Sequence, residues 1–111
     1  MKLSSLTDTE RLALGGLLRL LVRADGEFSE QEEEKINALG DELGGREQLW
    51  RAISDSAQAF KTDQDIRAAG IGIERPEVRT LTLRLLKQVA LSDSMSPGEE
   101  GILSALSAAW K

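Results

Sequence analysis

Hydrophobic residues recur at helical spacing along most of the chain, and the clearest stripe lies between residues 8 and 24. Its members are Leu14, Leu17, Leu18, Leu21 and Val22. Spacings of three and four place them on one face of an α-helix, and Asp8 is a suitable residue to cap its start. Gly15 and Gly16 interrupt this helix at a cost of about 1 kcal/mol each relative to alanine. We therefore predict that another helix crosses closely at this point.

The same periodicity predicts further helices over 29–43, 46–60, 63–69, 76–91 and 96–110. Gly44 and Gly45 separate the second helix from the third, and Pro76 suits the first turn of the fifth. The isolated Ile71 and Ile73 stand between glycines and do not make a strand. We predict an all-α fold, a compact bundle of about five to seven helices in a single domain over 1–111. The most apolar helices, 8–24 and 76–91, are expected to be central.

An internal duplication relates the two ends of the chain, with copies over approximately 8–44 and 76–111. In register, Leu17, Leu18, Leu21 and Asp25 match Leu85, Leu86, Val89 and Asp93. After one loop residue is dropped, Phe28, Ser29, Glu32, Ile36, Leu39 and Leu43 match Met95, Ser96, Glu99, Leu103, Leu106 and Trp110. Each copy therefore reads as a helix, a sharp turn and a second helix, with acidic groups at the turn.

Helix capping accounts for part of this acidic turn. Ser29 with Glu32, and Ser96 with Glu99, have the spacing of a capping box, in which the glutamate also suits the helix dipole. Asp25 and Asp93 are different, because an aspartate at the C-terminal end of a helix is opposed by the dipole. This repeated misfit makes Asp25, Glu32, Asp93 and Glu99 candidate ligands of a divalent cation. A purely local structural role of these residues is the alternative.

Composition limits the chemistry of any site. The chain has no cysteine and no histidine, which removes thiolate ligands, thiol nucleophiles and the commonest general base. A bound metal would be a hard cation held by oxygen, such as Ca²⁺ or Mg²⁺. The turns are not EF-hands, because the twelfth position from Asp25 is Ile36. Lysines and arginines number 14 against 19 acidic residues, a net charge of -5 that disfavours nucleic-acid binding.

The segment Ala24-Asp25-Gly26-Glu27-Phe28-Ser29-Glu30-Gln31-Glu32 resembles the helix-turn-helix signature of TerB-like domains, the tellurite-resistance family. That domain is related to the N-terminal part of some membrane-anchored J-domain co-chaperones. The resemblance spans nearly the whole chain. It implies an all-helical domain with an internal duplication and acidic residues that bind divalent cations, Ca²⁺ among those proposed. The second copy departs from the pattern, since Ser94 replaces glycine and one loop residue is missing.

Together these observations predict a small cytoplasmic helical domain that binds a divalent cation at its acidic turns and docks a protein partner, in a stress or metal-resistance context. One alternative is a metal-free interaction module, and a second is a metal-dependent hydrolase. We expect no enzyme activity, because the chain lacks histidine, the commonest general base, has no phosphate-binding loop and has only four aromatic residues to line a substrate cleft. Trp50 is expected in the core, and Trp110 is a candidate partner contact. Arg84 and Lys87 are candidate contacts for an anionic lipid or an acidic partner, although a solvated face is the ordinary explanation.

Overall fold

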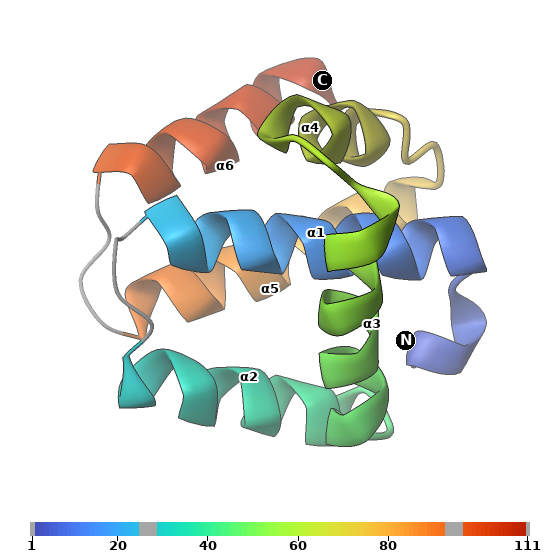
Figure 1. Ribbon diagram of the computed structural model, residues 1–111, viewed down its shortest axis with the longest axis vertical. Coiled ribbons are helices and arrows are strands. Elements are labelled where there is room, and N and C mark those ends of the chain that lie inside the picture. The colour runs from blue at the N-terminus through green and yellow to red at the C-terminus, as the bar shows by residue number, and fades with distance from the viewer. Residues whose placement is uncertain (1, 25–28, 93–96, 111) are drawn as a thin grey trace.

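The computed structural model describes residues 2–24, 29–92 and 97–110, and within them it is all-helical (Figure 1). A short 3₁₀ helix, η1 (Leu3–Ser5), precedes six α-helices in the described residues. These are α1 (Asp8–Ala24), α2 (Glu30–Glu42), α3 (Arg46–Ala59), α4 (Asp63–Ile71), α5 (Pro76–Leu91) and α6 (Pro97–Ala109). The predicted all-α bundle and its helix count are confirmed.

Helix α1 lies at the centre of the bundle and packs against α3, α4, α5 and α6. Its leucines at 14, 17, 18 and 21 are fully buried. The predicted close crossing at its glycines is confirmed. A Cβ atom on Gly15 would lie 2.4 Å from the carbonyl oxygen of Ala52 in α3, and one on Gly16 would lie 3.1 Å from the ring of Phe60. The backbones of α1 and α3 are therefore nearly in contact, which only glycine allows.

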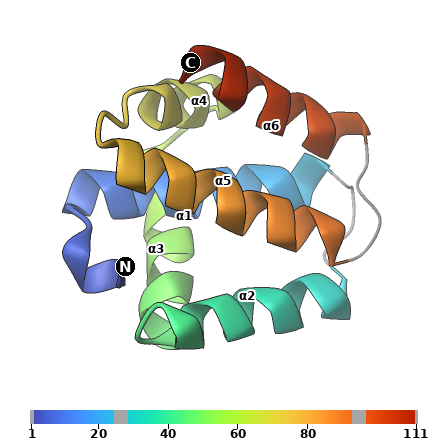
Figure 2. The ribbon, with the colours of Figure 1, turned by 180° about the vertical axis from the view of Figure 1, so that it is seen from behind.

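The two sequence copies pack reciprocally. The first helix of each copy packs against the second helix of the other, α1 against α6 and α5 against α2, while α1 and α5 pack against each other. The connecting segment between the copies breaks this symmetry, because α3 covers α1 and α2 while α4 covers α1 and α6. Figure 2 shows α5 in front, with no described helix crossing its outward side. The sequence predicts that α1 and α5 are both central. Of these two, only α1 has α3 and α4 packed on it in addition to the helices of the other copy.

Three helix ends differ from the sequence predictions in their caps or bounds. Thr7, rather than Asp8, caps α1, since its hydroxyl accepts a hydrogen bond from the Glu10 amide at 3.1 Å. Thr62, rather than Asp63, caps α4 through a capping box with Asp65. Helix α4 also continues to Ile71 instead of ending at residue 69. Gly70 lies inside the helix and packs closely on α1, since a Cβ at this position would lie 3.0 Å from the Leu17 side chain.

Replacing Gly15 with alanine tests the contact between α1 and α3. We expect Gly15→Ala to lower the free energy of unfolding by on the order of 2 kcal/mol, because the new methyl group overlaps backbone atoms that have no freedom to rotate away. Gly101→Ala is the matched control, since nothing lies within 4 Å of a Cβ there. That change should stabilise the protein by about 0.5–1 kcal/mol through helix propensity alone. Chemical denaturation measures both, and equal effects at the two sites would contradict the proposed contact.

Candidate functional site

Four helix ends meet at one side of the molecule, which we call the acidic edge. It consists of the C-terminal ends of α1 and α5 at Ala24 and Leu91, and the N-terminal ends of α2 and α6 at Glu30 and Pro97. Both views show these ends on the same side (Figures 1 and 2). A Cβ on Gly98 would lie 3.3 Å from the Cβ of Ala24, so the start of α6 packs directly on the end of α1. The fold thus brings the helix ends that flank both copies of the acidic turn to one side.

Glu32 is positioned by the first turn of α2, where it completes the predicted capping box with Ser29. Its Oε1 accepts hydrogen bonds from the Ser29 amide at 3.0 Å and from the Ser29 hydroxyl at 3.2 Å. In return the Ser29 hydroxyl accepts a hydrogen bond from the Glu32 amide at 3.1 Å. Only 1% of Glu32 is exposed. One carboxylate oxygen of Glu32 is therefore already engaged in capping the start of α2, as the capping interpretation of the sequence predicts.

Glu99 occupies the equivalent place in the second copy. Both glutamates stand third in their helices, α2 and α6, and Glu99 is likewise only 1% exposed. Burial of a carboxylate is unfavourable unless hydrogen bonds or a cation compensate it, and here the same burial occurs in both copies. The shared burial is the strongest structural sign that the two turns are equivalent.

The other two predicted ligands, Asp25 and Asp93, lie outside the described residues, as does the predicted cap Ser96. In the part of the chain that is described, no three acidic side chains are grouped as a metal ion would require. Glu32 and Glu99 supply oxygen donors of the type that Ca²⁺ and Mg²⁺ prefer. Without the aspartates, however, the described residues do not form a complete coordination sphere. The four-residue cation site stays a prediction.

A groove of about 830 Å³ lies between the start of α1 and the outer side of α3, away from the acidic edge. Its charged lining residues are Asp8, Arg11, Arg51 and Asp55. Arg11 is already committed to Asp8 and to the carbonyl oxygens of Leu3 and Leu6. Neither Glu32 nor Glu99 lines this groove, so the groove and the candidate cation ligands are separate features of the surface.

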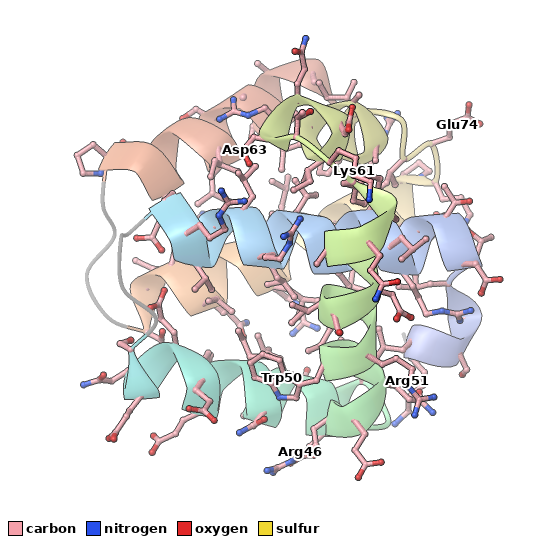
Figure 3. All side chains as sticks on the ribbon, viewed as in Figure 1. Arg46, Trp50, Arg51, Lys61, Asp63 and Glu74 are labelled. Carbon is pink, nitrogen blue, oxygen red and sulfur yellow. The ribbon has the colours of Figure 1, made fainter. Side chains whose placement is uncertain are left out.

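The two tryptophans differ in their surroundings. Trp50 is half-buried and packs against the core. It extends from α3 toward α2, where its indole N–H donates to Asn37 Oδ1 at 2.6 Å (Figure 3). Trp110 is also half-buried against the core, and the Arg79 guanidinium lies 6.0 Å from its ring centroid. Trp50 therefore packs against the core, on the side where it is expected, but both tryptophans are only partly buried and keep some exposed surface.

The strongest charge interaction in the described structure was missed by our sequence analysis. Arg75, between α4 and α5, donates from Nε to Glu10 Oε2 at 2.8 Å and from one terminal nitrogen to Glu10 Oε1 at 2.5 Å. Glu10 Oε1 also accepts from the Thr7 amide at 2.8 Å. The Thr-x-x-Glu spacing of a capping box was the available signal for Glu10, but its partner lies 65 residues away. This ion pair ties the start of α1 to the start of α5.

Comparison with known proteins adds no family assignment. No protein-family model matches the chain, and neither the curated proteins nor the solved structures give a match. Among the described helices, none has the length and hydrophobicity needed to cross a bilayer.

The Glu10–Arg75 ion pair predicts an acid-sensitive contribution to stability. Hydrogen bonding from Arg75 is the main reason that the pKa of Glu10 is lowered from its ordinary value of 4.5 to about 2. Since the folded-state pKa is depressed, this contribution is present above pH 4.5 and is lost as the pH falls toward 2. We expect Glu10→Gln to cost on the order of 2 kcal/mol at pH 7, allowing for the partial exposure of Arg75.

Denaturant unfolding of wild type and Glu10→Gln at pH 7, 4, 3 and 2 measures this contribution directly. The difference between the two proteins should shrink across the acidic part of that range. Glu47→Gln, at an exposed position of α3, is the matched control and should show a small difference at every pH. A Glu10→Gln difference that does not change with pH would exclude an ionised Glu10 as its cause.

Proposed function

We propose that this protein is a small helical interaction domain that binds a divalent cation at its acidic edge, with Asp25, Glu32, Asp93 and Glu99 as ligands. The ion would offset the repulsion between carboxylates and hold the two helix-turn-helix units together. Its binding free energy would add to the stability of the fold or of a complex with a protein partner. The resemblance to TerB-like domains supports a cation of the Ca²⁺ type and a stress or metal-resistance context.

One observation carries this proposal. The helix ends that flank the two turns lie on the same side of the bundle, and each copy buries a glutamate to 1% exposure at the same helical position. Capping explains why a glutamate is present, but exposed capping boxes serve as well, as Thr62 with Asp65 does at the start of α4. A buried carboxylate at the same place in both copies would supply oxygen donors for a cation at the acidic edge. Asp25 and Asp93, one in each turn, would complete the set of ligands.

The alternative is a metal-free interaction domain. Two observations favour it. The Oε1 atom of Glu32 is engaged by Ser29, and the described residues contain no ready-made acidic group for a metal. In that case the acidic turns only end and start helices, and the surface of the bundle carries the binding function.

Isothermal titration with Ca²⁺, Mg²⁺ and Mn²⁺ distinguishes the two functions. If a cation binds, Asp25→Asn should weaken binding at least about tenfold, because a carboxylate ligand is lost. Glu34→Gln removes the same charge from an exposed position of α2 and should change binding by less than about twofold. Cation binding should also raise the melting temperature of the wild type, and a chelator should reverse the rise.

The metal-free alternative has the opposite expectation. No heat and no change of melting temperature would be seen at millimolar ion, and Asp25→Asn would bind as poorly as wild type. Equal weakening by Asp25→Asn and Glu34→Gln would indicate only a general attraction of cations to an acidic surface. Either outcome would remove the proposed site.

A further inference from the structure

The internal duplication leaves one helix face uncovered. In register with α1, the helix α5 begins at the equivalent residue, and Gly15, Gly16, Arg19 and Arg23 of α1 correspond to Leu83, Arg84, Lys87 and Leu91. On α1 this face is crossed by α3 and α4. On α5 the equivalent residues are half-buried or exposed, because the chain supplies one connecting segment for two copies.

The burial of the two helices differs at several positions of this face. Gly15 and Gly16 are buried, whereas Leu83 is half-buried and Arg84 is exposed. Leu91 is 59% exposed, the most exposed of the large hydrophobic residues in the described chain. The core positions Leu85 and Leu86, by contrast, are as buried as their counterparts in α1. Arg23 of α1 is exposed like Leu91, so the loss of cover on this face of α5 lies at Leu83, Arg84 and Lys87.

The charge of this face is opposite to that of the protein. Helix α5 carries Arg79, Arg84 and Lys87 and has one acidic residue, Glu77, in a chain of net charge -5. Arg84 reaches Glu42 of α2 at 3.1 Å, and both side chains stay largely exposed. Lys87 is exposed and makes no ion pair within the described residues. An exposed leucine beside a lysine that has no ion pair among the described residues is a pattern suited to an acidic partner with apolar residues.

We propose that the outward face of α5, formed by Thr80, Leu83, Arg84, Lys87 and Leu91, docks an acidic amphipathic helix of a partner protein, in the place that α3 takes on α1. In the first copy a helix, α3, covers the equivalent face of α1, so we expect a helix on α5 as well. The basic residues of α5 favour a partner helix that is acidic. Apolar residues of the partner would contact Leu83 and Leu91, and its carboxylates would face Lys87 and Arg84.

The partner helix cannot repeat the contact of α3 in detail. Gly15 lets the backbone of α3 approach to van der Waals distance, but Leu83 stands at the equivalent position of α5. The docked helix would therefore lie at an ordinary interaxial distance of about 8–10 Å, with Leu83 inserted between its side chains. One helix on this face makes a small interface, for which a dissociation constant on the order of 10–1000 μM is expected.

Amide NMR titration of the whole protein tests this inference with two synthetic peptides. Both are stapled helices with leucine along one face, and one has glutamate while the other has lysine at the flanking positions. The acidic peptide should shift amide signals of α5 between Thr80 and Leu91, and the basic peptide should not. Lys87→Glu should weaken binding of the acidic peptide roughly tenfold or more, since it replaces attraction with repulsion, and Leu91→Ser should weaken it through lost apolar contact.

Lys61→Glu is the matched control. Lys61 is an exposed lysine between α3 and α4, on the side that faces the viewer in Figure 3, whereas α5 lies behind α1 in that view. This control should leave the affinity within about twofold of wild type. Circular dichroism and melting temperature confirm that each variant is folded.

Several outcomes would overturn the inference. These are the absence of shifts at millimolar peptide, shifts outside α5, or equal effects of Lys87→Glu and Lys61→Glu. Lys87-dependent sedimentation with phosphatidylserine vesicles and no peptide binding would identify a membrane contact instead. A concentration-dependent dimer that buries α5 would identify self-association.

This inference rests on the partner-docking part of the proposed function and is independent of its cation part. The titration is therefore run once with Ca²⁺ and once with a chelator. Peptide binding in both conditions supports the docking face even if isothermal titration detects no cation. Cation binding without peptide binding would support the cation site at the acidic edge and contradict the proposal that α5 docks a partner helix.

Discussion

The fold depends on the near-contact between the backbones of α1 and α3 at Gly15. This contact allows α3 to cross α1 tightly enough for α1 to be enclosed by α3, α4, α5 and α6. An enclosed helix must be apolar around most of its circumference, which explains why the segment 8–24 has so continuous a leucine pattern. The same crossing gives the asymmetry of the molecule, since its counterpart on α5 is absent from the described structure.

Two chemical features follow from this architecture and lie on different parts of the surface. The reciprocal packing of the copies, α1 with α6 and α5 with α2, draws the helix ends that flank both acidic turns to one edge. The single connecting segment leaves the basic face of α5 without a covering helix in the described structure. We propose the first feature as a cation site and the second as a docking face for an acidic helix. The two features can act separately, because they share no residue except Leu91 at the end of α5.

Ion pairing reinforces the bundle where helix packing is least continuous. Glu10 and Arg75 join the start of α1 to the start of α5, and the buried carboxylate is held ionised by the guanidinium, which lowers its pKa. Arg79 lies over Trp110 and so connects α5 to the end of α6. The first contact joins α1 to the start of α5, and the second joins α5 to the end of α6. They stabilise the arrangement of the helices and have no evident part in either proposed site.

The sequence by itself determined the helices, because apolar residues at spacings of three and four describe a buried stripe without reference to neighbours. It also determined the capping box of Ser29 with Glu32 and the need for a close crossing at Gly15, which are local constraints. Only the tertiary structure decided that Glu10 pairs with Arg75, that Glu32 and Glu99 are equally buried, and that α5 is open where α1 is covered. These depend on contacts between residues far apart in the chain, which periodicity and local spacing do not encode.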